Sequence, residues 1–309
     1  MPEYDRLPVR HSRFNDHSRF NDTASRRRRR RFDDEDDLHT SLRRTPHPPP
    51  PDEDPIEGDR WSTWDVGQHG PTPHPDWLVT ELAAVDTELG VLKTGKEADV
   101  HLVERGVPGT LRSCLLAAKR YRTAEHRMFH RDAAYIEGRR VRRSRETRAM
   151  ARRTAFGRDL LAGQWAAAEF SALCRLWSLG ASVPYPVQLF GTELLLEYLA
   201  EEDGQAAPRL AQLRPEPAAL RKLWDQLIDA LVLLTDEGLA HGDLSPFNLL
   251  VHQGRLVLID LPQVVDIVAN PQGPAFLARD VRIVTEWFTA RGLPQHVAAA
   301  GAARVVDKS

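Results

Sequence analysis

The sequence has very little cysteine: only Cys114 and Cys174 occur in 309 residues, without the spacing typical of a disulfide framework or a zinc site. It also lacks any apolar run close to the ~20 residues that a membrane-spanning helix needs. Its polar, charged beginning has no apolar segment like that of a secretory signal. These absences favour a protein of the reducing cytoplasm, with no disulfide, no zinc site and no membrane contact. The length allows two ordinary domains, or one bilobal domain with a tail.

Residues 1–75 lack the aliphatic side chains needed to bury a core, so we predict a disordered tail rich in charge and proline. The sequence HSRFND occurs there twice in tandem, and an arginine run at 26–31 is followed at once by an acidic run at 33–37. Two interpretations of the arginine run stay open: a contact with RNA, or solvated charge that the acidic run balances. Trp61 and Trp64 are apolar enough to dock on the folded body.

A strand, a glycine turn and a second strand are predicted between Gly90 and Val103, around the sequence KTGKEAD. A glycine at such a turn lets backbone N–H groups approach a phosphate, and a neighbouring lysine adds positive charge. Thr94, Gly95 and Lys96 are therefore candidates for a phosphate-binding loop. The pattern is weak by itself, because the full G-x-G-x-x-G motif is absent.

Lys119 ends a predicted strand at 115–118, in the sequence LLAAKRY, which is similar to the V-A-I-K motif of kinases. That lysine bridges the nucleotide phosphates and a helix glutamate. Residues 123–158 are basic with little apolar periodicity, which predicts a long flexible insertion. An apolar stripe then predicts a helix at 160–179. Glu169 lies on this helix and is the natural ion-pair partner of Lys119.

An apolar strand at 192–199 (TELLLEYL) runs into a polar loop, and this exit is where a kinase hinge would lie. A helix with an apolar face from 220 to 234 follows. We therefore expect a small lobe at 76–199, a large lobe at 200–295 and a C-terminal tail at 296–309.

The segment HGDLSPFN, from His241 to Asn248, fits the kinase catalytic-loop pattern H-x-D-L-x-x-x-N. A hairpin predicted at 249–259 should fold the next carboxylate, Asp260, back beside Asn248. Phosphoryl transfer needs one carboxylate to orient or deprotonate the acceptor, and oxygen ligands that hold Mg²⁺ against the phosphates. Asp243 suits the first role, while Asn248 and Asp260 suit the second. The plainer alternative is a polar turn before a buried strand, with Asp243 as a cap.

Seven segments occur in one order over about residues 80–290: TGKEADVHLV, LAAKRY, RDAAYIEG, WAAAEF, VPYP, HGDLSPFN and LIDLPQVVD. Together they resemble the RIO family of atypical serine/threonine protein kinases, most closely its first branch. The resemblance implies an α+β, two-lobed protein-kinase-like fold, trimmed of the long activation segment and the usual peptide-docking part. It also implies ATP and Mg²⁺ as cofactors, Mn²⁺ as a substitute for Mg²⁺, and a protein substrate that offers serine or threonine.

The same resemblance implies roles for nucleotide-binding residues. Lys119 would bind the phosphates, and Glu197 and Leu199 would meet the adenine edge through backbone groups. Ser245 stands where a typical protein kinase has a catalytic-loop lysine. The segment KTGKEAD departs from the family, which usually has a serine and an asparagine there, and Pro262 is a second departure.

For the catalytic residues, the resemblance implies that Asp243 accepts the proton and that Asn248 and Asp260 bind magnesium. It further implies that Asp260 can transiently accept the phosphate as an acyl phosphate, which would make the protein an ATPase as well as a kinase.

Two other functions stay open. Small-molecule phosphotransferases of the aminoglycoside or choline kinase type share HGDL and the following asparagine, but they carry an acceptor-binding helical region after the metal aspartate. Fewer than fifty residues follow Asp260 here. The third possibility is a nucleotide-gated binding protein that acts in assembly, for which the basic tail and insertion would contact RNA or a ribosomal particle.

Overall fold

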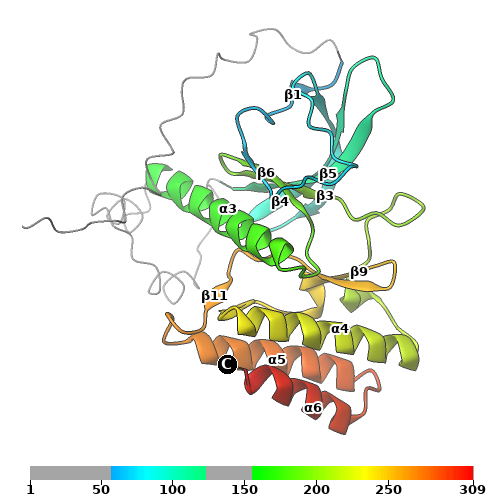
Figure 1. The fold of residues 1–309 in the computed structure, drawn as a ribbon, viewed down its shortest axis with the longest axis vertical. Helices are drawn as coiled ribbons and strands as arrows, with labels where there is room; N and C mark the ends of the chain where they lie inside the picture. Colours follow the sequence, from blue (N-terminus) through cyan, green and yellow to red (C-terminus); the bar gives the residue numbers. More distant parts are fainter. Residues whose placement is uncertain (1–56, 123–154, 309) are drawn as a thin grey trace, which may run out of the picture. The chain divides into compact units, whose positions relative to one another are not determined.

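The computed structural model describes residues 57–122 and 155–308, and only the backbone of residues 155–160 (Figure 1). All of these residues belong to one compact unit, 49–309. The predicted tail up to residue 56 and most of the predicted insertion lie outside the described residues. None of the described helices is long and apolar enough to cross a membrane.

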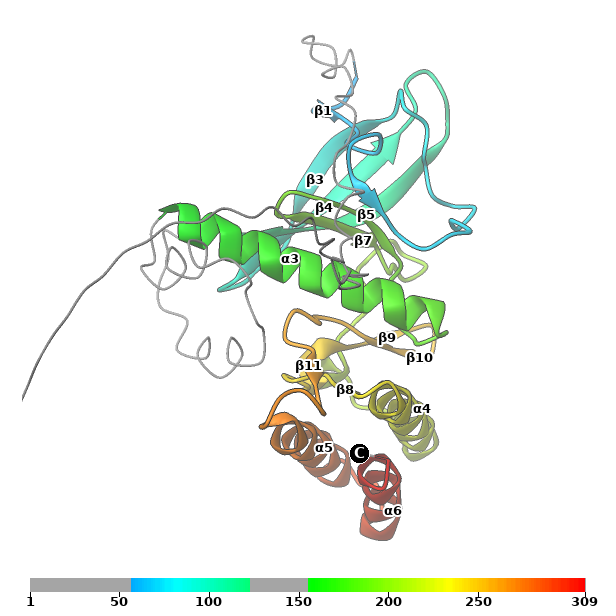
Figure 2. The same cartoon turned by 60° about the vertical axis from the view of Figure 1, so that its left-hand side comes forward.

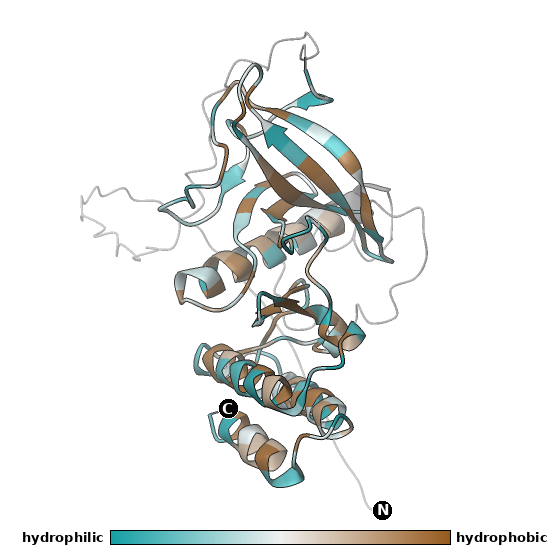
Figure 3. Cartoon of the chain, turned by 90° about the vertical axis from the view of Figure 1, so that its right-hand side faces the viewer, coloured by the Kyte–Doolittle hydropathy of each residue, from teal (hydrophilic) through white to brown (hydrophobic). Residues whose placement is uncertain are grey.

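The small lobe is a seven-stranded antiparallel sheet with strand order β1-β3-β4-β5-β7-β6-β2. Buried side chains alternate with more exposed ones over much of β5, and Figure 3 shows hydrophobic and hydrophilic residues in turn along strands of the sheet. The strands are β1 (Arg60–Trp61), β2 (Gln68–His69), β3 (Val85–Thr94), β4 (Ala98–Gly106), β5 (Ser113–Tyr121), β6 (Pro186–Phe190) and β7 (Glu193–Glu197).

Residues 57–75 belong to this lobe, so the tail boundary predicted at 75 was wrong for this part. Strands β1 and β2 form the two edges of the sheet. On the β1 edge, Trp61 pairs with Val85. Trp64 is buried, as expected for a docked tryptophan, and joins the core that contains Leu78. The segment needs few aliphatic residues because it completes a core that later parts of the chain supply.

Helix α3 (Ala155–Ser178) packs beside the sheet and contributes to both lobes (Figure 2). It begins before the predicted 160, so the last four residues assigned to the insertion are helical. Its buried side chains Phe170, Leu173 and Leu176 belong to the same apolar cluster as the large-lobe helices. The helix thereby fixes Glu169 between the sheet and the large lobe.

The large lobe consists of helices, short strands and two 3₁₀ turns. The helices are α4 (Pro217–Asp236), α5 (Gly273–Thr289) and α6 (Gln295–Val306). The 3₁₀ turns are η2 (Leu210–Gln212) and η3 (Pro246–Asn248). The strands are β8 (Leu239–Ala240), β9 (Leu249–His252), β10 (Arg255–Leu258) and β11 (Val265–Asp266), with β9 paired to β10 and β8 to β11.

The predicted C-terminal tail at 296–309 was wrong, because α6 covers most of it and packs on α4 and α5. The fit depends on Gly301, where an added Cβ would lie 2.8 Å from the Trp224 ring. Ala298 and Val305 are fully buried on the same helix. Small side chains let this helix approach the tryptophan closely. A local sequence pattern does not predict this contact, because the two partners are far apart in the sequence.

Candidate active site

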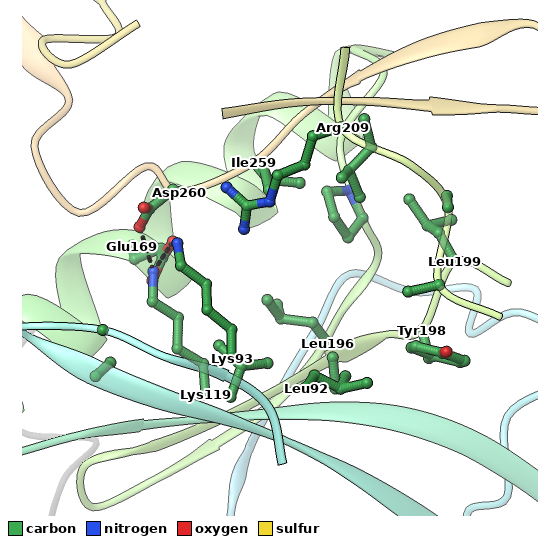
Figure 4. A pocket seen from close by; sticks show the side chains of 18 of the residues that line it. Leu92, Lys93, Lys119, Glu169, Leu196, Tyr198, Leu199, Arg209, Ile259 and Asp260 are labelled. Atoms are coloured by element: carbon green, nitrogen blue, oxygen red, sulfur yellow. Dashed lines mark hydrogen bonds and ion pairs between the residues drawn. The ribbon is translucent and has the colours of Figure 1, made fainter. Parts of the chain in front are cut away.

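A cavity of about 680 Å³ opens between the small-lobe sheet and the β9–β10 hairpin of the large lobe (Figure 4). Part of its wall is apolar, formed by Leu92, Ala117, Leu196, Leu250 and Ile259. Charged side chains gather at the other end, as Figure 4 shows. An apolar slot that ends in convergent charges suits a ligand with a flat apolar part and an anionic part.

Lys119 lies on β5 and is held between two carboxylates. Its Nζ donates to Glu169 Oε1 at 2.8 Å and to Asp260 Oδ1 at 2.6 Å. Burial favours the neutral amine, but the two carboxylates outweigh burial and raise the pKa of Lys119. The ion pair predicted between Lys119 and Glu169 is confirmed, and the lysine remains charged at neutral pH.

Glu169 is the most enclosed carboxylate of the site, with only 1% of its surface exposed. It accepts hydrogen bonds from Lys119, from the Tyr121 hydroxyl and, at 2.9 Å, from the Leu261 backbone N–H. Burial, followed by the Glu169 charge, raises the pKa of Tyr121 well above its usual value, so the phenol stays a donor. Glu169 therefore fixes both the lysine and the chain that follows Asp260.

Asp260 adopts a left-handed backbone conformation, with φ of 67°. Few non-glycine residues accept this conformation, although aspartate does so more readily than most. Burial disfavours its charged form, but the charge of Lys119 outweighs burial and lowers the pKa of Asp260. The carboxylate is about one third exposed, at 34%, and faces the cavity as an anion.

The loop that carries Asp243 is held by its backbone. The carboxylate of Asp280 accepts the N–H of Gly242 at 2.7 Å and that of Leu244 at 3.1 Å. The N–H of Asp243 donates to His241 Nδ1 at 3.4 Å, and His241 Nε2 donates to the Ile259 carbonyl at 3.1 Å. These bonds join the loop to α5 and to the end of the hairpin, and they leave the Asp243 side chain 43% exposed.

Asn248 lies beside the strand that leads to Asp260, as the hairpin predicted. Its carbonyl accepts the Ile259 N–H at 3.1 Å, and its Nδ2 donates to the Asp243 carbonyl at 2.9 Å. The second bond orients the amide, so that Oδ1 is the atom available as a ligand. An amide oxygen and a carboxylate are hard donors that fit Mg²⁺ held jointly with phosphates.

Most of the predicted site residues line the cavity. They are Gly95, Lys96, Lys119, Glu169, Glu197, Leu199, Asp243 and Asp260. Within the described structure, three others lie outside its lining: Thr94, Ser245 and Asn248. Thr94 bonds the carboxylate of Asp99 instead, and Ser245 precedes η3, where its carbonyl accepts the Asn248 N–H at 2.9 Å.

The predicted hinge residues border the apolar end of the cavity. The Glu197 N–H donates to the Tyr185 carbonyl at 2.9 Å, and the Leu199 carbonyl accepts the Ala207 N–H at 2.8 Å. Leu199 could therefore present its N–H, rather than its carbonyl, to a ligand.

Sequence reasoning missed two cations of the cavity, Lys93 and Arg209. Lys93 stands two residues before Gly95, so its place in the predicted phosphate loop was a usable signal. Arg209 follows the hinge loop in no recognised motif, and it is brought to the site by its bridge to Leu250 and by its hydrogen bond to the Phe247 carbonyl.

Comparison with known proteins agrees with these features. A sequence model described as the RIO domain matches residues 113–300. The RIO-type serine/threonine-protein kinase Rio1 of Haloferax volcanii is 36% identical over 128 residues, which cover 41% of this chain and 43% of that protein. Serine/threonine-protein kinase RIO1 of Caenorhabditis elegans is 31% identical over 206 residues, covering 66% of this chain and 38% of that one.

A search of solved structures finds the crystal structure of the Rio2 kinase-ADP/Mg²⁺-phosphoaspartate complex from Chaetomium thermophilum. It has 20% sequence identity and a TM-score of 0.49, and the match covers 71% of this chain and 62% of that one. The chain spans about two fifths of the length of the first two curated relatives. Since the RIO-domain match includes Lys119, the catalytic loop and Asp260, and extends over more than half of the sequence, the chain belongs to the RIO family.

Proposed function

We propose that this protein is an ATP- and Mg²⁺-dependent protein kinase that transfers a phosphoryl group to serine or threonine. One observation carries the proposal: Lys119 is held between Glu169 and Asp260 in the same cavity that Asp243 lines. Its curated relatives in Haloferax volcanii and Caenorhabditis elegans are named serine/threonine-protein kinases, which supports the same activity.

The proposed division of labour follows from exposure and contacts. Asp243 would accept the proton of the attacking hydroxyl, because its carboxylate is the more exposed of the two and borders the cavity. Lys119 would keep its bond to Glu169 and exchange Asp260 for the phosphates of the nucleotide. Asn248 and Asp260 would hold Mg²⁺, which supplies charge neutralisation at the phosphates.

Several finer features belong to the same proposal. Mn²⁺ would substitute for Mg²⁺, since it is also an octahedral cation with oxygen ligands. The protein would act in the cytoplasm, in keeping with its scarce cysteine. The same proposal includes an RNA or ribosomal contact through the basic tail, 1–75, and the insertion, 123–158, of which residues 1–56 and 123–154 lie outside the described ranges.

The test is a single-turnover reaction of the purified full chain with γ-labelled ATP, Mg²⁺ and a protein acceptor such as casein. Label on serine or threonine supports the proposal. Transfer to a small alcohol would favour the aminoglycoside or choline kinase type, and tight ATP binding without transfer would favour the nucleotide-gated binding protein. Label that hydroxylamine removes would reveal an acyl phosphate, for which Asp260→Asn is the control.

A further inference from the structure

The cavity contains two cations that the roles above do not use. Lys93 extends from the end of β3 in the small lobe, and Arg209 lies in the large lobe between the hinge loop and η2. Figure 4 shows both side chains reaching into the cavity from opposite walls, toward the end that holds Asp260. Neither forms an ion pair within 4.0 Å among the residues that the structure describes.

The two cations repel each other across the cavity, although Lys93 is exposed and Arg209 is only partly buried. Burial and then the repulsion from Arg209 lower the pKa of Lys93, against the opposing attraction of Asp260. Burial likewise lowers the pKa of Arg209. The nearest anion, Asp260, already accepts from Lys119 at 2.6 Å and so offers them limited compensation. Like charges that share a site store electrostatic free energy, which an anion binding between them releases.

A structural role accounts for only part of this arrangement. Arg209 donates from one guanidinium nitrogen to the Phe247 carbonyl, within the catalytic loop. A guanidinium carries five N–H donors in a planar fork, so this bond leaves others for a ligand. Lys93 is an exposed side chain that lines the cavity, so its ammonium is accessible to a ligand there.

We infer that Lys93 and Arg209 form a clamp for the phosphate chain of the nucleotide, one cation from each lobe. This inference rests on the proposed function and deepens it, because it names the residues that distinguish a triphosphate from the nucleoside alone. Each cation gains a charge-assisted hydrogen bond when a polyphosphate lies between them. Since the clamp spans the two lobes, binding of the phosphate chain also draws the lobes together.

The test compares the dissociation constants of adenosine and of ATP with Mg²⁺, measured by calorimetry on the full chain. The variants are Lys93→Met, Arg209→Met and the double variant, since methionine keeps the length of the side chain without its charge. Lys222→Met on the exposed face of α4 is the matched control for net charge. We expect each clamp variant to bind ATP about tenfold more weakly, the equivalent of about 1.4 kcal/mol. Adenosine affinity should stay within about twofold, because its contacts lie at the apolar end.

Two further experiments distinguish an effect of the lost charge on ATP binding from an effect on the folded structure. Lys93→Arg and Arg209→Lys keep the positive charge and should retain most of the ATP affinity. If the Arg209 guanidinium had only a structural role, Arg209→Lys would bind ATP as weakly as Arg209→Met. Inorganic tripolyphosphate should compete with ATP in the wild type and about tenfold less well in either methionine variant. If ATP and adenosine weaken together in both single variants, or neither changes more than in Lys222→Met, the clamp is wrong. A wild-type chain that binds no ATP at all would instead refute the proposed kinase function, and the clamp with it.

Discussion

Replacing Lys119 by methionine should have two separable effects, one on stability and one on nucleotide binding. The substitution leaves the fully buried Glu169 without its cation, next to the carboxylate of Asp260. Removing one partner of a buried ion pair typically costs about 3–5 kcal/mol. Asp260 is one third exposed, and Glu169 keeps its bonds from Tyr121 and Leu261, so we expect a value near the lower limit, about 3 kcal/mol.

The double variant Lys119→Met/Glu169→Gln distinguishes the two effects. A glutamine can still accept the Leu261 N–H through its oxygen and can donate to the Tyr121 hydroxyl. Because no buried charge is then left unpaired, the free energy of unfolding should return to within about 1–2 kcal/mol of the wild type. ATP affinity should stay low in both variants, since both lack the phosphate-binding ammonium.

Urea unfolding followed by circular dichroism measures the stabilities, and calorimetry measures the dissociation constants. Two results would refute the reasoning. The single variant could be as stable as the wild type, in which case the pair contributes nothing to the fold. Alternatively, the double variant could regain ATP affinity along with its stability, in which case the lysine acts only through the fold.

Three further predictions concern positions that hold the site or the sheet. In Gly242→Ala, a Cβ would lie 2.1 Å from the Gln263 carbonyl oxygen at a φ of +82°, so transfer activity should fall at least tenfold in a labelled-ATP assay; unchanged activity would contradict this contact. Asp280→Asn replaces one of the two oxygens that accept loop N–H groups, so kcat should drop about 10- to 100-fold with little change in ATP affinity, and a change in affinity alone would count against a positioning role. Arg105→Met leaves the buried Asp86 without its bidentate partner, at 2.7 and 3.1 Å, and should lower the free energy of unfolding by about 3–5 kcal/mol; a smaller loss in urea unfolding would show that the pair is dispensable.

Local sequence patterns predicted the parts of the site that depend on local geometry. The catalytic hairpin forms because Gln253 and Gly254 both adopt positive φ in a two-residue turn, which sets the pairing of His252 with Arg255. That register carries Asp260 back to Asn248. The pair of Lys119 and Glu169 spans 50 positions, and its prediction depended on the order of kinase-like motifs rather than on periodicity.

The missed features depend on tertiary contacts. Strands β1 and β2 are two residues long and exist only because a sheet edge is present to pair with them. Helix α6 is largely alanine and valine, and its place is set by the surface of Trp224 that it covers. Arg209 comes from a loop with no motif and reaches the cavity through its bridge to Leu250 and its hydrogen bond to the Phe247 carbonyl. Such contacts have no local signature, since each partner is distant in the sequence.

In the proposed mechanism, Asp243 assists transfer while Lys119 and Asp260 hold the nucleotide. The most direct measurement compares Asp243→Asn with the wild type in two quantities, the rate of phosphate transfer to a protein serine or threonine and the dissociation constant of ATP with Mg²⁺. We predict that the transfer rate falls by ~10²- to 10⁴-fold while the dissociation constant changes little, because the substitution keeps the shape of the side chain and removes only the base. Asp260→Asn should weaken ATP binding itself, since it removes an anionic ligand of the metal. Transfer that continues at the wild-type rate in Asp243→Asn would contradict the account.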